Sequence, residues 1–345
     1  MNYYIIQIFS FGIATFLLWM LIIPYFIEFL NKRKLGKQIR EEATIWKATE
    51  FYKLHKKKAW TPAIGWAVIL FIAFLMVWSS IVLQKFWFVN NSLFNQQETY
   101  LSLFTLASVW ALWLFDDLLN IKWKWRTKWV SVWFKMTWLF IFALAWALWF
   151  YFKLDWWDVP LNLTVVKWIT LWVWIIPLFI FVILWASNSV NITDWLDWLA
   201  WWLLFFSYAV YAYITYSQWM YLLSALCITI VGALIAFLWY NVKPAKLYMW
   251  DVGSLALWAN LWIMAMLTNT LFILCIVWAI FIFETISVII QLTSKKLRKG
   301  KKIFRIAPFH HHLEALGWPE ENVVFRLRLI WIVFAVFAIM FYILQ

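Results

Sequence analysis

Five aspartates stand at the ends of long apolar runs, where their carboxylates could act together. Asp116 and Asp117 end one run, and Asp251 begins another. Asp194 and Asp197 begin a third run, and their spacing of three puts them on one helix face. Several carboxylates at one surface can hold Mg²⁺ with substrate phosphates, because Mg²⁺ prefers hard oxygen ligands. The pattern therefore predicts phosphate chemistry supported by a divalent cation.

Amide, imidazole and ammonium groups are predicted close to these carboxylates. They are Asn188, Asn191, Asn241, the run His310-His311-His312, and the flanking lysines Lys58, Lys128 and Lys135. Each group also has a structural interpretation, because acids favour a first helical turn and basic clusters set membrane orientation. Glu284 lies inside an apolar run, and we expect it to face the interior and make a structural hydrogen bond. Convergence of the acidic, amide and histidine groups favours a site.

The apolar runs that carry these groups predict an all-α membrane protein. Of the 345 residues, 66% are hydrophobic and 13% charged, against roughly 25% charged in an average soluble domain, which excludes a soluble protein. A helix needs about 20 residues to cross a bilayer. Ten runs are candidates: 4–30, 62–84, 100–115, 134–152, 165–187, 194–216, 219–240, 252–268, 270–292 and 326–344. We expect one domain over 1–345, with cytoplasmic loops near 31–61, 116–133, 188–193, 241–251 and 293–325.

The basic residues orient these ten predicted helices. If the helices alternate in direction, 26 of the 29 lysines and arginines fall on one side. The positive-inside rule makes that side cytoplasmic and places both termini outside. The net charge of +13 fits anionic lipid headgroups better than nucleic acid, because the bases lie between apolar runs. All five aspartates then lie at the cytoplasmic rim.

Five segments, in their order and spacing, resemble the phospho-N-acetylmuramoyl-pentapeptide-transferase family, which belongs to the polyprenyl-phosphate N-acetylhexosamine-1-phosphate transferases. The segments are Asp116-Asp117-Leu118-Leu119-Asn120, Asn191-Ile192-Thr193-Asp194 with Asp197, Asn241 followed by Pro244-Ala245, Asp251-Val252-Gly253-Ser254-Leu255, and Ala307-Pro308-Phe309-His310-His311-His312-Leu313-Glu314. The likeness covers the whole chain. Its most specific part is the triple histidine with the Gly317-Trp318-Pro319-Glu320 that follows.

The resemblance implies transfer of phospho-MurNAc-pentapeptide from its UDP carrier to undecaprenyl phosphate, giving lipid I and UMP with Mg²⁺ as cofactor. It implies catalytic roles for Asp116, Asp117 and Asp251, and metal binding by Asp251, Asp117 and Asn188. Substrate contacts are implied for Lys58, Lys135, Asn191, Asp194, Asp197, Asn241, Gln291, His310, His311 and His312. It further implies a multi-pass protein of the bacterial inner (plasma) membrane, with a cytoplasmic site and as a homodimer. Direct attack and a phospho-enzyme on an aspartate both stay open.

Tryptophan replaces glycine at many family positions. The chain has 33 Trp and 7 Gly, whereas average usage predicts roughly 24 glycines. The exchanged positions are Trp60, Trp66, Trp113, Trp129, Trp195, Trp198, Trp201, Trp202, Trp250, Trp258 and Trp262, while Trp239 and Trp318 stand where the family has or tolerates tryptophan. Large side chains beside the aspartates would fill the nucleotide pocket. We predict that many of these residues are glycine in the cell, because a gene using UGA for glycine, translated with UGA as tryptophan, gives this one-way exchange.

Other interpretations stay open beside this one. Engineered tryptophans or an inactive paralogue would also explain the exchange. A sister transferase using another UDP-sugar shares the acidic motifs. A transporter or channel would need ionisable residues near the midplane of several spans, where the sequence has Glu284. A non-catalytic lipid-binding relative is the expectation if the tryptophans are real.

Overall fold

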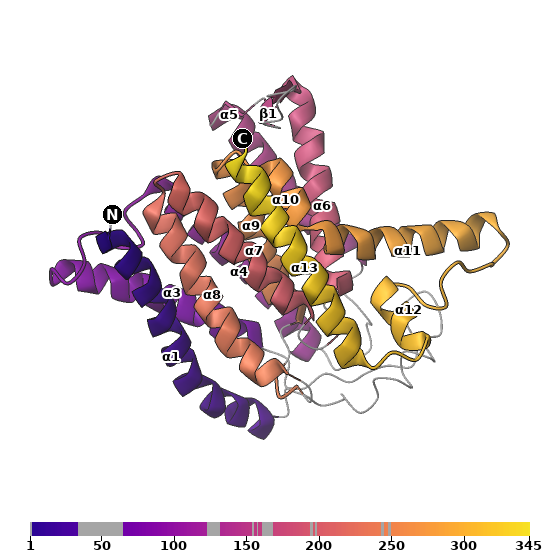
Figure 1. Ribbon diagram of the computed structural model, residues 1–345, viewed down its shortest axis with the longest axis horizontal. Helices are drawn as coiled ribbons and strands as arrows, with labels where there is room; N and C mark the ends of the chain where they lie inside the picture. Colours follow the sequence, from indigo (N-terminus) through magenta and orange to yellow (C-terminus); the bar gives the residue numbers. More distant parts are fainter. Residues whose placement is uncertain are drawn as a thin grey trace.

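The computed structural model describes residues 2–33, 65–122, 132–153, 155–156, 158–160, 168–193, 196, 199–242, 245–247 and 250–345. Most of these residues are helical (Figure 1). The helices are α1 Asn2–Lys32, α3 Gly65–Lys85, α4 Gln97–Lys122, α5 Val132–Lys153, α6 Ile175–Thr193, α7 Leu199–Ser217, α8 Tyr221–Asn241, α9 Trp250–Leu267, α10 Leu271–Val277, α11 Ala279–Leu297, α12 Phe309–Ala315 and α13 Glu320–Ile343. The strands β1 Asp158–Pro160 and β2 Trp168–Thr170 form an antiparallel hairpin, followed by the 3₁₀ turn η2 Trp172–Trp174.

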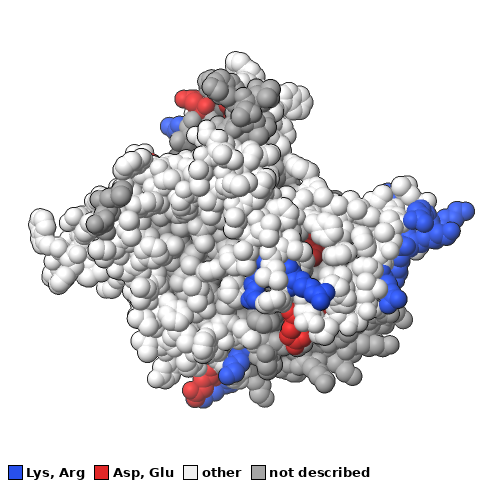
Figure 2. All heavy atoms as spheres, in the orientation of Figure 1, with Lys and Arg blue, Asp and Glu red and all other residues white. Residues whose placement is uncertain are grey.

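Several helices are suited to a lipid environment. Within the described residues, five helices are long and apolar enough to cross a membrane, and a sixth span results if α10 and α11 are counted as one. The five are α1, α5, α7, α8 and α13. Figure 2 shows a broad face with few charged groups, and the basic residues gather at the far end of α11 and near the start of α13. The chain is therefore a membrane protein, while ten spans stay a prediction.

Hydroxyl groups inside these helices are satisfied by the helix itself. Thr215 Oγ1 donates to the Tyr211 carbonyl at 2.6 Å, and Thr229 Oγ1 donates to the Ala225 carbonyl at 2.8 Å. Such bonds to the preceding turn hide polar groups that would be costly in an apolar surrounding. The sequence can therefore place serine and threonine in these helices without breaking them.

Glycine lets two of the helices come close together. Gly12 of α1 faces Gly232 of α8, and a Cβ at Gly232 would overlap the Gly12 carbonyl oxygen. Small residues at helix crossings allow close backbone approach, which is the usual basis of helix association in membranes. This crossing keeps α1 packed along α8.

Polar contacts define one end of the bundle, which we call the termini end. The Tyr3 hydroxyl accepts a hydrogen bond from the Asn90 backbone N–H at 2.7 Å, and Ser217 Oγ lies 2.8 Å from the Tyr342 hydroxyl. Trp156 Nε1 donates to Asn269 Oδ1 at 3.3 Å. These contacts join the start of α1, the ends of α7 and α13, and the segments that follow α3, α5 and α9. Both chain termini and the hairpin lie toward the top of Figure 1.

The opposite ends of the same helices form what we call the site end. It contains the last residues of α1, α4, α6 and α8 and the first residues of α3, α5, α7, α9 and α13. Because each of these helices has its other end at the termini end, their directions alternate along the chain. The predicted placement of the acidic motifs at one rim depends on this alternation.

The fifth predicted span begins later than expected. Residues 168–170 form β2 and residues 172–174 form η2, so α6 starts at Ile175 rather than near 165. The backbone of Trp168–Thr170 pairs with Asp158–Pro160, which satisfies hydrogen bonds that a helix would otherwise make. Trp172 and Trp174, whose place in the sequence suggested the middle of a helix, are exposed at the termini end. That position matches the usual location of tryptophan at a membrane interface.

The ninth predicted span, 270–292, is not one straight helix. α10 ends at Val277, α11 begins at Ala279, and the two helices are bent by 70°. Trp278 lies at the break with φ −99° and ψ 5°, outside the helical region. As a result α11 points sideways out of the bundle (Figure 1). The bend brings Glu284 toward the site end instead of leaving it within a continuous span.

Candidate functional site

The catalytic aspartates predicted from the sequence lie on two packed helices. Asp116 and Asp117 are in the last turns of α4, and Asp251 is the second residue of α9. The two helices are joined by Asn260 Nδ2, which donates to the Ser102 carbonyl at 2.9 Å. Both helices present these ends at the site end. The structure describes the backbone of the three aspartates but not their side chains.

The amide and lysine candidates are distributed around the same end. Asn188 and Asn191 lie in the last turns of α6, and Lys135 lies in the first turn of α5, each described by its backbone alone. Lys58, Asp194 and Asp197 lie outside the described residues. The last two fall between α6 and α7, whose adjoining ends are at the site end. The chain therefore brings α4, α5, α6 and α9 together where the sequence predicted a site.

Several predicted loops are helical. α4 continues to Lys122, so the expected loop at 116–133 begins later, and the expected loop at 188–193 lies entirely within α6. The expected loops at 241–251 and 293–325 also overlap α9, α11, α12 and α13. Polar residues in a last helical turn are solvated at the membrane surface, so they do not have to end the helix. Asp116 and Asn191 are thus held on helices, which fixes their position more firmly than a loop would.

Asn241, a predicted substrate contact, closes the turn that follows α8. Its side chain is buried, and Nδ2 donates to the Leu247 carbonyl at 2.7 Å. The Lys246 backbone N–H bonds the Tyr240 carbonyl at 2.9 Å beside it. These contacts shape the segment that leads to Asp251.

Gln291, another predicted substrate contact, holds a segment of the chain. Its Oε1 accepts from the backbone N–H groups of Ile303 and Phe304, each at 3.0 Å, and its Nε2 donates to the Phe304 carbonyl at 2.7 Å. The side chain is buried in α11. It therefore anchors the segment that leads into the histidine motif.

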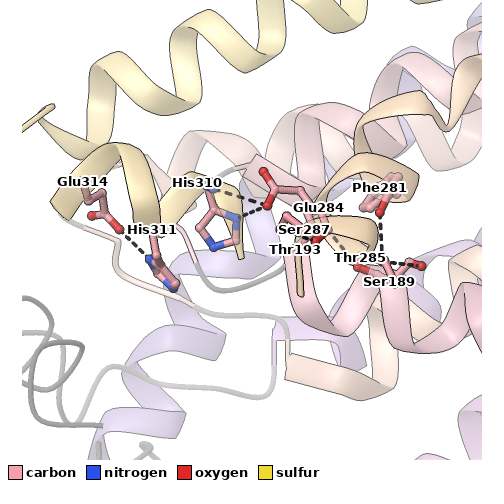
Figure 3. A network of polar contacts seen from close by, with 9 residues as sticks. All are labelled: Ser189, Thr193, Phe281, Glu284, Thr285, Ser287, His310, His311 and Glu314. Atoms are coloured by element: carbon pink, nitrogen blue, oxygen red, sulfur yellow. Dashed lines mark hydrogen bonds and ion pairs between the residues drawn. The ribbon is translucent and has the colours of Figure 1, made fainter. Parts of the chain in front are cut away.

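The three histidines form part of a short helix rather than a loop. α12 runs from Phe309 to Ala315, and His310 and His311 are buried. Each Nδ1 lies beside a different partner. His310 Nδ1 lies 3.2 Å from Glu284 Oε2, and His311 Nδ1 lies 2.6 Å from Glu314 Oε2 (Figure 3). His312 Nδ1 accepts from the Arg305 backbone N–H at 3.1 Å.

These partners favour different tautomers for His311 and His312. A carboxylate hydrogen-bonded at Nδ1 favours a proton on that nitrogen, as in His311. A backbone N–H beside Nδ1 requires a lone pair there, so neutral His312 carries its proton on Nε2. Adjacent imidazoles in one motif are thereby prepared for different hydrogen-bonding roles.

Glu284 and Thr285 of α11 are functional candidates that sequence reasoning did not assign to the site. Glu284 is fully buried and, as expected from the sequence, faces the protein interior. Thr285 Oγ1 donates to Ser189 Oγ at 2.7 Å, which ties α11 to the end of α6 (Figure 3). The signal in the sequence was a carboxylate within an apolar run, which is costly without a partner. Its partner, His310, is 26 residues away and only the fold brings them together.

The residue types that the sequence predicts for the site suit Mg²⁺ better than a transition metal. No group of three or more His, Cys, Asp or Glu side chains in the described part of the chain could hold a metal ion. Nδ1 of His311 and of His312 makes a hydrogen bond, and a carboxylate lies beside Nδ1 of His310. The three aspartates that α4 and α9 bring to this end supply hard oxygen atoms, which suit Mg²⁺.

The chain is similar to known proteins over nearly its full length. Residues 99–269 match the model of the family described as glycosyl transferase family 4. The phospho-N-acetylmuramoyl-pentapeptide-transferase of Geobacillus thermodenitrificans is 31% identical, with 94% of this chain and 95% of the relative covered. The proteins of the same name from Geobacillus sp. strain WCH70 and Anoxybacillus flavithermus are each 33% identical, with 95% and 96% of both chains covered.

Proposed function

The chain belongs to the phospho-N-acetylmuramoyl-pentapeptide-transferase family, and from this premise we propose the reaction it catalyses. It transfers phospho-MurNAc-pentapeptide from UDP-MurNAc-pentapeptide to undecaprenyl phosphate, which yields lipid I and UMP. The observation that carries this proposal is the likeness to enzymes of that name over nearly the whole of both chains. In the reaction a new P–O bond forms at the sugar-bearing phosphorus, the diphosphate bridge breaks there, and UMP leaves.

The site end suits these two substrates. The nucleotide is water-soluble and the acceptor phosphate lies at the bilayer surface, so the reaction needs groups at a membrane rim. The described helices bring the backbone positions of Asp116, Asp117 and Asp251 to one end of the bundle. Phosphoryl-type transfer depends mainly on positioning and on neutralising charge, which acidic and basic groups at one surface can provide.

We assign roles to the residues by motif. Asp251 and Asp117, with Asn188, would hold Mg²⁺, which when bound neutralises phosphate charge. Asp116 would act on the attacking lipid phosphate as base or as an orienting group. Asn241 would help to hold the uridine and its diphosphate through the turn that it shapes. Direct contacts with them would come from Lys58, Lys135, Asn191, Asp194 and Asp197. The three histidines would contact phosphate or sugar.

The proposed topology follows from the same residues. The chain would form one domain with ten spans, with both termini outside and the site end in the cytoplasm. The 26 basic residues on that side support this orientation. The enzyme would lie in the bacterial inner membrane, and the family resemblance suggests a homodimer.

A comparison of donors tests the proposed substrate. The purified chain, as printed and with glycine at positions 195, 198 and 250, is given undecaprenyl phosphate with either UDP-MurNAc-pentapeptide or UDP-GlcNAc. We expect release of UMP and formation of lipid I with the first donor, dependent on added Mg²⁺. Turnover of UDP-GlcNAc alone would instead identify a sister transferase.

A further inference from the structure

A buried carboxylate and a buried imidazole meet at the site end. The side chains of Glu284 and His310 are both 0% exposed. Glu284 Oε2 accepts the backbone N–H of His310 at 3.3 Å and lies 3.2 Å from its Nδ1 (Figure 3). A carboxylate without polar partners would be costly in such a place. The backbone bond fixes the start of α12, and the carboxylate lies on the Nδ1 side of the His310 ring.

The other atoms of this pair point to a ligand. Glu284 Oε1 and both ring nitrogens of His310 are buried and make no hydrogen bond among the described residues, although Nδ1 lies 3.2 Å from Glu284 Oε2. Buried polar atoms nearly always have a partner in proteins. If the Nδ1 proton faces the nearby Glu284 carboxylate, Nε2 can accept from a substrate hydroxyl in the neutral ring, or donate to a phosphate oxygen in the protonated ring.

Thr285, the next residue of α11, contacts the end of α6. Thr285 bonds Ser189, which lies between Asn188 and Asn191 on α6. Two adjacent residues therefore align the helix that carries the asparagines and the helix that carries the histidines. This arrangement exists because the bend at Trp278 turns α11 across the site end.

We propose that Glu284 is a positioning residue that orients His310 toward the phosphate or hydroxyl of the substrate. This inference rests on the proposed transferase function. Glu284 does not touch the reacting atoms and acts through the histidine ring. Partners that orient a functional imidazole in this way typically change activity about 10- to 100-fold when they are replaced.

A double-mutant cycle tests the proposal. We expect Glu284→Gln to lower kcat about 10- to 100-fold, and to cause no further loss in a His310→Ala chain. Ser287→Ala is the matched control, because Ser287 is buried one turn along α11 and its hydroxyl donates to the Glu284 carbonyl at 2.6 Å. We expect this control to keep full activity. Independent, additive losses from Glu284→Gln and His310→Ala would overturn the proposal.

Nitrogen NMR of the imidazoles tests the same proposal without turnover. The chain has four histidines, so a His310→Ala chain identifies the His310 signals. We expect a protonated Nδ1 on His310, and a change of tautomer in Glu284→Gln at unchanged thermal stability. An unchanged tautomer would refute the positioning role. If this result is as expected and no donor is turned over, the proposed function fails while the Glu284–His310 pairing stands.

Two tryptophans follow the C-terminal ends of helices, at a position where glycine is normally found. At the end of α3, the Trp87 N–H bonds the Gln84 carbonyl and the Phe88 N–H bonds the Leu83 carbonyl. At the end of α7, the Trp219 N–H bonds the Tyr216 carbonyl and the Met220 N–H bonds the Thr215 carbonyl. This pair of bonds is the Schellman motif, whose central residue is left-handed and usually glycine, sometimes asparagine.

Two other helices of this chain end in the same motif and can be compared with α3 and α7. The same pair of bonds ends α9 around Asn269 and α12 around Gly317, the residue types that the motif prefers. Trp87 and Trp219 both have φ 65°, which is rare for a bulky side chain. Their side chains are 93% and 71% exposed, so packing does not compensate for the strained backbone. Trp172, with φ 50°, shares this feature.

Another pair of tryptophans has too little room. The rings of Trp258 in α9 and Trp278 at the α10–α11 break are stacked with centroids 2.7 Å apart. Aromatic pairs normally keep their centroids 4.5–7 Å apart. Both side chains are buried, and Trp278 Nε1 has no hydrogen-bond partner in the described structure. The space between the two helices therefore fits one indole.

From these backbones we infer that positions 87 and 219, and at least one of 258 and 278, are glycine in the cellular protein. Trp87, Trp219 and Trp278 are additional to the positions that the family resemblance singles out. The coding DNA tests this inference directly. We expect TGA at these positions and TGG at Trp318, whose ring lies 4.1 Å from the Arg326 guanidinium and so has a role as tryptophan. TGG at both 87 and 219 would overturn it.

Protein measurements give a second test. Mass spectrometry of peptides from the source cells should show glycine at 87 and 219, and tryptophan there would refute the inference. In the chain made from the printed sequence, Trp87→Gly and Trp219→Gly should each raise the midpoint temperature of unfolding. Trp318→Gly, the matched control, should lower it because the cation–π contact is lost.

Discussion

Asp251→Asn is expected to reduce transferase turnover by roughly 10²- to 10³-fold, the loss typical of removing one group that stabilises developing charge. Asparagine keeps the size of the side chain but loses the negative charge that would hold Mg²⁺ on the phosphates. Asp251 is the second residue of α9, at the end of the bundle where α4 brings Asp116 and Asp117. The measurement is UMP release with saturating donor and acceptor across a range of Mg²⁺ concentrations.

Asp158→Asn is the control for this loss of charge. Asp158 is an exposed residue of β1, at the termini end and so on the opposite side of the protein. We expect full turnover from this variant. Equal turnover of Asp251→Asn and the unmodified chain would contradict the assigned role, as would a loss of the same size in Asp158→Asn.

Glycine at positions 195, 198 and 250 is expected to raise turnover about 10²-fold over the chain as printed, since small displacements near reacting groups can cost that much. Trp195 and Trp198 adjoin Asp194 and Asp197, and Trp250 directly precedes Asp251. Three indoles beside these carboxylates would occupy the space that a nucleotide needs. The comparison uses kcat and the KM for UDP-MurNAc-pentapeptide in the triple variant and in the printed chain.

Trp239→Gly serves as the control for the glycine substitutions. Trp239 is a largely exposed residue of α8, and its indole fills no space inside the protein. The variant should not gain activity. Equal turnover of the triple variant and the printed chain would show that the tryptophans do not block the site, and would favour the non-catalytic interpretation if both are inactive.

The helical nature of the protein could be predicted from composition and run length. A long apolar stretch satisfies its backbone hydrogen bonds internally as a helix, so each of the ten predicted runs contains a helix in the structure. The family was also recognisable, because acidic and histidine motifs keep their order and spacing along the chain. Full-length relatives confirm that recognition.

The break at Trp278 and the late start of α6 could not be predicted. Hydropathy does not distinguish a straight apolar helix from two helices bent by 70°, because both segments are equally apolar. At 168–170, strand pairing with residues 158–160 replaces helical hydrogen bonds. Local composition was compatible with either outcome, and contacts between distant segments selected one.

The sequence by itself determined that this is a helical membrane protein of a transferase family, with its acidic motifs at helix ends. These properties follow from the chemistry of each residue and its near neighbours. The tertiary structure decided which groups meet: Glu284 with His310, Thr285 with Ser189, and Gln291 with the segment before α12. Such pairings depend on how helices bend and pack, and hydrogen bonds are too short-ranged for sequence spacing to specify them.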